Sequence, residues 1–249
     1  MSEDSLTALV TGASAGLGLE FCRQLADRCD VIIAVARRRE RLQKLAQELD
    51  GAAEVHGIVA DLSTVEGVAA TLEALRQKGP VDYLVNNAGF SPFGQFADLP
   101  IDVQQEMVSV HCNATLALCR GAVPFMRERG AGVIINVSSL GALMSGKGMA
   151  VYGATKAFLN YFSESLQAEL AGTGIVVQAL CPGFTRTEFH EAMAQHGFER
   201  QRIPEELWME SAAVVQASLQ AIGSGEVIVV PGEANQALAA SLLAKAGAG

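Results

Sequence analysis

The sequence has few charged residues, few aromatic residues and no long apolar run. Charged residues make up 18% and aromatic residues 6% of the 249-residue chain, whereas half of its residues are hydrophobic. A chain of this length and composition can bury a sizeable core, which favours one globular domain over residues 1–249. No apolar stretch approaches the roughly 20 residues that a helix needs to cross a bilayer, so we expect no association with a membrane.

Runs of basic residues are equally scarce. The formal net charge of −9 argues against a surface that binds nucleic acid or an anionic membrane. Four arginines, Arg37, Arg38, Arg39 and Arg41, form the one dense basic cluster. The N-terminal residues are acidic, unlike the basic start of a signal peptide, and we expect a cytoplasmic protein.

Paired cysteines and metal-ligand spacings are also missing. The five cysteines are odd in number, lack C-x-x-C spacing and fall within apolar patterns, which favours reduced thiols in the core. The four histidines form no ligand-spaced cluster with them, so we expect no metal site.

Short β-branched, apolar runs recur along the chain, and segments with helical spacing lie between them. Since parallel strands need helical crossovers, this alternation predicts an α/β fold. We expect a doubly wound, Rossmann-type parallel sheet of about seven strands with helices on both faces. The predicted strands are residues 6–10, 31–36, 54–59, 81–85, 132–137, 175–180 and 226–230. A long helix is predicted from about residue 102 to residue 129, with Gly130 as its stop.

A glycine-rich segment directly follows the first predicted strand and opens a helix. Glycines allow a tight turn there and let amide groups at the helix N-terminus face a pyrophosphate. An ordinary glycine-rich turn is the alternative, whereas a Walker loop is excluded because no Gly-Lys-Ser/Thr ends the segment. The candidate nucleotide-binding residues are Gly12, Ser14, Ala15, Gly16, Leu17 and Gly18.

Tyr152 and Lys156 are four residues apart, which places them on one face of a helix predicted over residues 153–162. A nearby cation favours the phenolate and lowers the pKa of a tyrosine from its usual value near 10. Proton exchange with a reacting oxygen then becomes feasible. The same spacing is common on surface helices, so the pair alone is a weak signal.

The glycine loop, its place near the N-terminus and the Y-x-x-x-K motif together resemble the short-chain dehydrogenase/reductase family. The resemblance covers residues 6–231. Its further matching positions are Asp61-Leu62, Asn86-Asn87-Ala88-Gly89, Asn113, Ser139 thirteen residues before Tyr152, Pro182-Gly183 and Thr187. Asp61, Asn86 and Asn87 also have a purely structural interpretation, as residues that satisfy backbone groups where strands end.

The resemblance implies catalytic roles for four residues. Tyr152 would be the general acid, and Lys156 would favour its ionisation and hold the nicotinamide ribose. Ser139 would donate a second hydrogen bond to the substrate carbonyl, and Asn113 would hold a water beside the lysine. Ser138 competes for the serine role, but the thirteen-residue interval favours Ser139.

The resemblance also implies contacts with a nicotinamide cofactor. Asp61 would bind the adenine, Leu62 would pack against it, and Asn87 would position the nicotinamide ribose. Thr187 would bind the nicotinamide amide or the pyrophosphate. The remaining predicted cofactor contacts are Ala88, Gly89, Pro182, Gly183 and Thr185, together with Tyr152 and Lys156.

The end of the second predicted strand indicates which cofactor binds. An acidic residue there would bind a free ribose 2′-hydroxyl, but the corresponding residue is Ala36. Arg37 and Arg38 follow it, and guanidinium groups can bind a 2′-phosphate. We therefore predict NADPH/NADP+ rather than NADH. These arginines could instead only begin a solvated helix, and Ala15 departs from the Arg or Lys that many NADPH-using members carry in the loop.

The predicted function is therefore an NADPH-dependent carbonyl (keto) reductase that acts on a small-molecule ketone. An NAD-dependent alcohol dehydrogenase of the same family and a non-catalytic, nicotinamide-binding regulator are the alternatives. Residues 184–206 are predicted to form a lid over the substrate, although their apolar residues could equally pack a short helix. The resemblance implies a homo-oligomer, a dimer or a tetramer, and the alanine-rich tail over residues 234–246 departs from the tetrameric pattern.

Overall fold

The computed structural model describes residues 5–92, 94–194 and 200–246. Its main sheet has seven parallel strands in the order β3-β2-β1-β4-β5-β6-β9. The predicted α/β, doubly wound fold is confirmed. The strands are β1 (Thr7–Thr11), β2 (Val31–Ala36), β3 (Glu54–Val59), β4 (Tyr83–Asn86), β5 (Gly132–Val137), β6 (Ile175–Leu180) and β9 (Ile228–Val229).

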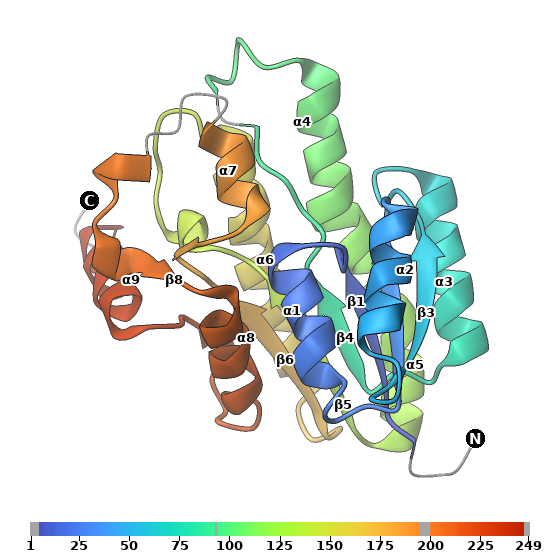
Figure 1. Cartoon of the computed structure of the whole chain (residues 1–249). Helices are drawn as coiled ribbons and strands as arrows, with labels where there is room; N and C mark the ends of the chain where they lie inside the picture. The colour runs from blue at the N-terminus through green and yellow to red at the C-terminus, as the bar shows by residue number, and fades with distance from the viewer. Residues whose placement is uncertain (1–4, 93, 195–199, 247–249) are drawn as a thin grey trace.

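The central strands are mainly apolar because helices cover both faces of the sheet (Figure 1). Along β2, Ile32 packs into one apolar cluster and Ile33 into the other, as alternate residues of a strand must. One cluster includes buried residues of α1 (Gly16–Leu25), α2 (Arg39–Glu48) and α8 (Ser211–Gln220). The other cluster includes residues of α3 (Val65–Lys78), α5 (Thr115–Arg129) and α6 (Ala150–Glu169). All five cysteines are buried free thiols, in agreement with the apolar patterns around them.

The long predicted helix is interrupted at its centre. It begins as α4 (Ile101–Val108), continues through a π-helical segment (Ser109–Ala114) and ends as α5, where Gly130 has a φ of 71°. The predicted limits are therefore close to those observed, but a regular α-helix was expected throughout. A π-helical segment shifts the phase of the side chains that follow it, and such segments are frequent at functional sites.

The irregular segments lie at the carboxyl edge of the sheet. After β6 the chain forms β7 (Phe184–Thr185), which pairs with β8 (Trp208–Met209), and α7 (Glu188–Ala194) lies between these two strands in the sequence. Short 3-10 turns at Arg200–Arg202 and Glu205–Leu207 precede β8, and α9 (Glu233–Ala246) ends the described chain. Residues 195–199 of the predicted lid lie outside the described residues. Among the residues that the structure describes, no helix is long and apolar enough to cross a membrane.

Candidate active site

Three of the four predicted catalytic residues converge where β5 is followed by α6. Ser139 comes two residues after β5, and its Oγ accepts a 3.0 Å hydrogen bond from the Gly141 amide. Tyr152 lies in the first turn of α6 and Lys156 one turn later. A Cβ built on Gly141 would lie 3.1 Å from Tyr152 Cε1 and 3.3 Å from Ser139 Oγ, so the phenol ring and the serine hydroxyl flank the same glycine.

The two adjacent serines have different surroundings. Ser138 is buried, and its Oγ donates a 2.9 Å hydrogen bond to the backbone carbonyl of Lys156. This bond ties the end of β5 to α6. Ser139 instead interacts with the phenol of Tyr152.

The pKa of Tyr152 differs from the sequence-based expectation in its direction. Burial raises it from 10.0 to about 12, and this effect outweighs the interaction with Ser139, which lowers it. Lys156 does not offset the burial because its Nζ donates a 2.8 Å hydrogen bond to the Val137 carbonyl and lies 5.8 Å from the centre of the phenol ring. Tyr152 therefore keeps its proton at neutral pH, as a proton donor must.

Lys156 is 5% exposed, and its burial lowers its pKa from 10.5 to about 8. In the unfolded chain the lysine keeps the higher value, so between pH 8 and 10.5 the unfolded chain binds more protons than the folded protein. Below pH 8 the folded protein bears the full free-energy cost of burying the ammonium. This cost disappears as the pH rises from 8 to 10.5. Lys156 consequently makes the folded state more stable with rising pH, by up to about 1.4 kcal/mol per pH unit.

Lys156→Met should remove this contribution. We expect the free energy of unfolding, measured by urea denaturation, to rise less between pH 8 and pH 10 in the variant than in the wild type. The difference between the two proteins is the useful quantity, because other groups titrate in both. The unpaired Val137 carbonyl of the variant adds only an offset that does not depend on pH. Equal slopes would contradict a depressed lysine pKa.

Asn113, the fourth predicted catalytic residue, is not brought to this cluster. It lies in the π-helical segment with an exposed side chain. His111, two residues earlier, is 1% exposed, and its ring centre lies 6.0 Å from that of Tyr152. The resemblance to the family pointed to Asn113 in the long helix, whereas in the structure it is His111 of the π-helical segment that lies toward Tyr152.

The hydrogen bonds of His111 determine its tautomer. The Thr155 hydroxyl donates to the Tyr152 carbonyl at 2.8 Å, so its oxygen must accept from His111 Nδ1, which lies 2.9 Å away. His111 Nε2 then carries the lone pair that accepts from the Phe90 amide at 3.2 Å. Burial and the charge of Lys156 lower the pKa of His111 well below 6.5, which keeps the ring neutral. His111 thus joins the loop after β4 to the helix that carries Tyr152.

The glycine loop lies where the strand order reverses, between β1 and β4, which is the usual ligand crevice of a doubly wound sheet. Thr11 Oγ1 accepts hydrogen bonds from the Asn87 and Ala88 amides at 2.9 and 3.0 Å. The Asn87 side chain donates to the Thr11 carbonyl at 2.8 Å. These bonds fix the loop after β4 against the loop after β1.

Glycine is required at two points of this loop. Gly12 has a φ of 68°, and a Cβ there would lie 2.7 Å from the Asn87 side-chain nitrogen. A Cβ on Gly18 would lie 2.3 Å from the Gly12 carbonyl oxygen. Gly12 and Gly18 therefore allow the loop, the start of α1 and Asn87 to pack closely, as in the glycine-rich turns that bind a pyrophosphate. Ser14, Ala15, Gly16 and Leu17 lie between these two glycines.

The remaining predicted cofactor residues border the same edge of the sheet. Asp61 follows β3 and accepts from the backbone and hydroxyl of Ser63 at 3.0 and 2.8 Å, so it has the structural role that the sequence left open. Leu62 is buried beside it. Gly89 packs on His111, since a Cβ at Gly89 would lie 2.7 Å from His111 Nε2.

The segment after β6 contacts both the catalytic cluster and the glycine loop. The Pro182 carbonyl accepts from the Leu140 amide at 2.9 Å, next to Ser139, and the Thr185 hydroxyl donates to the Gly183 carbonyl at 3.3 Å. A Cβ built on Gly16 would lie 3.3 Å from the side chain of Thr187, which therefore covers the glycine loop.

The arginines after β2 are engaged in ion pairs. Arg38 donates to Ser14 Oγ through Nε and Nη2, at 3.1 and 2.9 Å, and its Nη1 lies 3.0 Å from a carboxylate oxygen of Glu188. Arg37 is 71% exposed and lies 3.8 Å from Asp61. Sequence reasoning identified Arg38 but not Glu188, because 150 residues separate the two along the chain.

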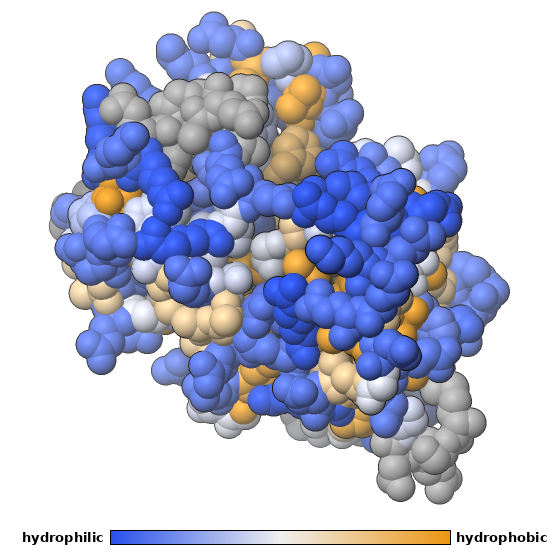
Figure 2. All heavy atoms as spheres, in the orientation of Figure 1, coloured by the Kyte–Doolittle hydropathy of each residue, from blue (hydrophilic) through white to orange (hydrophobic). Residues whose placement is uncertain are grey.

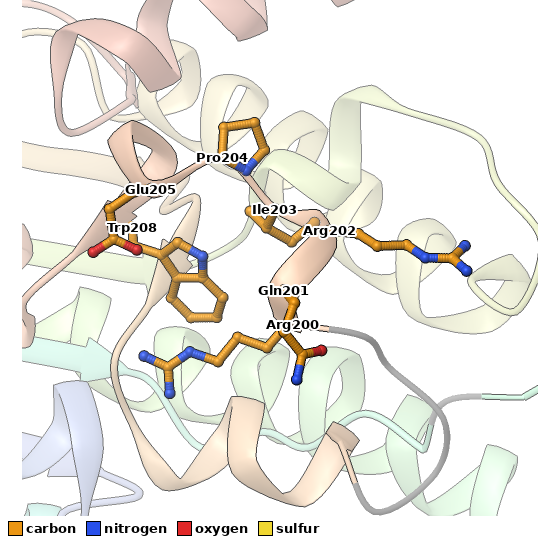
Figure 3. A pocket seen from close by; sticks show the side chains of 7 residues that line it. All are labelled: Arg200, Gln201, Arg202, Ile203, Pro204, Glu205 and Trp208. Carbon is orange, nitrogen blue, oxygen red and sulfur yellow. The ribbon is translucent and has the colours of Figure 1, made fainter.

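The segment predicted as a lid contains a pocket of about 580 Å³ (Figure 3). Its lining residues are Arg200, Gln201, Arg202, Ile203, Pro204, Glu205 and Trp208. The Arg200 guanidinium lies over the Trp208 indole at 4.6 Å, and Arg186 lies 5.6 Å from the same ring. Phe189 of α7 brings this segment to the catalytic cluster, because its ring centre lies 6.1 Å from that of Tyr152.

These observations fit a dinucleotide. The glycine loop leaves backbone exposed at a helix N-terminus, the crevice lies at the reversal of strand order, and Arg38 lies next to the loop. The glycine loop and Ser14 would hold the phosphates, and Lys156 would hold the nicotinamide ribose.

Comparison with known proteins agrees with this description. The profile of the short chain dehydrogenase family matches residues 6–197. A short-chain dehydrogenase from Sphingobium yanoikuyae, solved in complex with NADPH, is 31% identical, with a TM-score of 0.86 over 98% of this chain and 94% of that one. A bulky-bulky ketone specific alcohol dehydrogenase from Comamonas testosteroni is 30% identical, with a TM-score of 0.81 over 92% and 86% of the two chains.

A curated relative, sulfoacetaldehyde reductase 2 from Chromohalobacter salexigens, is 35% identical over 184 residues, which is 73% of each chain. The family profile covers more than half of the chain, and the similarity in fold extends over nearly all of it. The chain therefore belongs to the short-chain dehydrogenase family and is an oxidoreductase.

Proposed function

We propose that this oxidoreductase is an NADPH-dependent carbonyl reductase. The observation that carries the proposal is the convergence of Tyr152, Ser139 and buried Lys156 beside a crevice that fits a dinucleotide. Bound NADPH would supply the hydride. Two residues would then act on the substrate oxygen: Ser139 donates a hydrogen bond to it, and Tyr152 gives it a proton, so that the carbonyl becomes an alcohol.

The raised pKa of Tyr152 is compatible with its proposed role as a proton donor. A phenol with a pKa of about 12 holds its proton at neutral pH and can release it to an oxygen that becomes strongly basic as it gains the hydride. Lys156, whose Nζ lies 5.8 Å from the centre of the phenol ring, does not lower the pKa of Tyr152 in this structure, and its proposed role is to hold the nicotinamide ribose. His111 keeps the helix of Tyr152 in place through Thr155.

The preference for NADPH rests on Arg38. Its guanidinium is held against Ser14 of the glycine loop, which is where a 2′-phosphate on the adenosine ribose would need a cation. The NADPH complex of the Sphingobium protein, which has a closely similar fold, also supports this choice. Arg37 is less suited, because it is more exposed and lies near Asp61.

Arg38→Gln should weaken the binding of NADP+ and leave the binding of NAD+ unchanged. A charge-assisted hydrogen bond at a half-exposed site contributes about 1.5 kcal/mol, so we expect roughly a tenfold loss of NADP+ affinity. Isothermal titration calorimetry measures both affinities. Arg39→Gln is the matched control, since Arg39 is the next residue, the first of α2, and is exposed. Equal loss for both cofactors, or in both variants, would refute the assignment.

An NAD-linked alcohol dehydrogenase is the second candidate function. The observation in its favour is that Glu188 already forms ion pairs with both Arg38 and Arg41. If this pairing persisted with cofactor bound, the arginines would favour a 2′-phosphate less strongly. The same titrations distinguish the two candidates.

The substrate is proposed to be an uncharged or acyl-bearing carbonyl compound, covered by a lid over residues 184–206. The Phe189 ring near Tyr152 supports this choice, because it adds an apolar surface next to the proposed proton donor. NADPH oxidation with a panel of ketones, diketones, aldehydes and acyl thioesters would identify the class.

The chain is also proposed to form a homo-oligomer. Its longest helices carry exposed apolar side chains, namely Leu116 and Phe125 on α5 and Tyr161 on α6. Exposed apolar groups on adjacent helices are typical of an interface between subunits.

A further inference from the structure

Glu188, the first residue of α7, binds two arginines of a distant element. Its Oε2 accepts from Arg38 Nη1 at 3.0 Å, and its Oε1 accepts from Arg41 Nη1. Arg41 lies in α2, and Arg38 immediately precedes this helix. Figure 2 shows hydrophilic residues extending from the region of α7 to that of α2 on this face of the molecule.

The carboxylate of Glu188 contacts Nη1, the one guanidinium nitrogen of Arg38 that does not bind Ser14. Arg38 uses Nε and Nη2 for Ser14 Oγ, and Nη1 for Glu188. A ribose 2′-phosphate and a carboxylate are both anions that accept charge-assisted hydrogen bonds from a guanidinium. A 2′-phosphate that binds Arg38 through Nη1 would therefore meet the carboxylate of Glu188 there.

We propose that Glu188 is a specificity-determining residue of the cofactor site, whose carboxylate competes with the 2′-phosphate of NADP(H) for Arg38. This inference rests on the proposed use of NADP(H). NADP(H) binding displaces the carboxylate, whereas NAD(H), which lacks the phosphate, leaves the ion pairs with Arg38 and Arg41 in place. Glu188 thereby reduces the preference for NADP(H) over NAD(H) that the arginines alone would give.

The neighbours of Glu188 connect this exchange to the active site. Thr187 covers Gly16 of the glycine loop, and the ring of Phe189 lies against that of Tyr152. The start of α7 thus contacts the proposed phosphate site and the proposed proton donor within three consecutive residues.

Glu188→Gln tests the competition, because the amide keeps the shape of the side chain and removes its charge. Exposed ion pairs are individually weak, and Glu188, Arg38 and Arg41 have side chains that are 47%, 44% and 45% exposed. We therefore expect NADP+ to bind the variant roughly three- to tenfold more tightly, with NAD+ affinity unchanged. Isothermal titration calorimetry measures this without turnover.

Two fragments of the cofactor, one with and one without the 2′-phosphate, test whether this phosphate causes the gain in affinity. Adenosine 2′,5′-bisphosphate should gain the same factor as NADP+, whereas 5′-AMP should gain nothing. Glu191→Gln is the matched control, because Glu191 is exposed on the same helix and the described structure gives it no ion pair with Arg38 or Arg41. Unchanged or weaker NADP+ binding in Glu188→Gln, or equal tightening in both variants, would overturn the competition.

Arg38→Gln separates this inference from the proposed function. If Arg38→Gln weakens NADP+ binding and Glu188→Gln has no effect, the NADPH preference stands and only the role of Glu188 is refuted. If Arg38→Gln leaves NADP+ binding unchanged, the NADPH preference fails, and the competition fails with it. The double variant should show no tightening relative to Arg38→Gln, because no guanidinium remains at position 38 to be contested.

Discussion

Tyr152→Phe should reduce carbonyl turnover by roughly 100-fold to 10,000-fold, which is the usual cost of removing a positioned general acid. Only the hydroxyl is lost. The phenylalanine ring can keep the ring contacts with His111 and Phe189, whose centres lie 6.0 and 6.1 Å from that of Tyr152. The measurement is NADPH oxidation with the best carbonyl of the panel, at saturating cofactor.

The control for this variant is cofactor binding. Tyr152 is only one of many predicted cofactor contacts, so the NADP+ affinity of Tyr152→Phe should fall by far less than its turnover, at most a few-fold. The thermal midpoint should also change little, because the packing of the ring is kept. Turnover within a few-fold of the wild type would exclude Tyr152 as the proton donor, whereas loss of turnover together with loss of binding would indicate a folding defect.

Gly18→Ala should abolish measurable nucleotide binding through a steric effect. A Cβ at this position would lie 2.3 Å from the Gly12 carbonyl oxygen and 2.4 Å from the Asn87 side-chain nitrogen. The Asn87 side chain cannot move freely, because Thr11 holds it where the adjacent strands β1 and β4 end. The Gly12 oxygen belongs to the backbone of the same loop. Helix α1 must then move away from the loop, and at least two charge-assisted hydrogen bonds to phosphate are lost. We expect a loss of affinity on the order of 100-fold or more.

The overpacking in Gly18→Ala should also lower the free energy of unfolding by about 1–3 kcal/mol. Urea denaturation measures this change, and calorimetry measures the affinity for NADP+. Gly146→Ala is the control, because a Cβ there meets only Met149 Sδ, at an ordinary 3.8 Å. Normal NADP+ affinity in Gly18→Ala would mean that the loop does not bind the pyrophosphate.

The strands show how much of the fold could be predicted from local pattern. Residues 31–36, 54–59, 132–137 and 175–180 were expected as strands and form β2, β3, β5 and β6 with the same limits. Apolar and β-branched residues dominate these runs, which is typical of parallel strands, so the limits of the runs match those of the strands. The predicted last strand, residues 226–230, is shorter in the structure, where β9 is Ile228–Val229 at the edge of the sheet. An edge strand has one partner and is less constrained by pairing.

The site was predictable where its residues are close in the sequence. Tyr152 and Lys156 share a helix, and Ser139 follows the adjacent strand, so their approach depends mainly on α6 lying against β5. Asn113 and His111 mark the limit of this reasoning. A π-helical segment depends on packing around it, and no spacing rule for a regular helix indicates which of the two side chains turns inward.

The sequence by itself determined the order of strands and helices, the glycine loop and the pairing of tyrosine with lysine, because these depend on short-range periodicity and on residue type. The tertiary structure alone decided the burial that raises the pKa of Tyr152 and lowers that of Lys156. It also decided which histidine lies beside the phenol and which carboxylate faces Arg38. Desolvation and ion pairing depend on which distant segments meet in space, and Arg38 and Glu188 meet only because the chain winds back across the sheet between them.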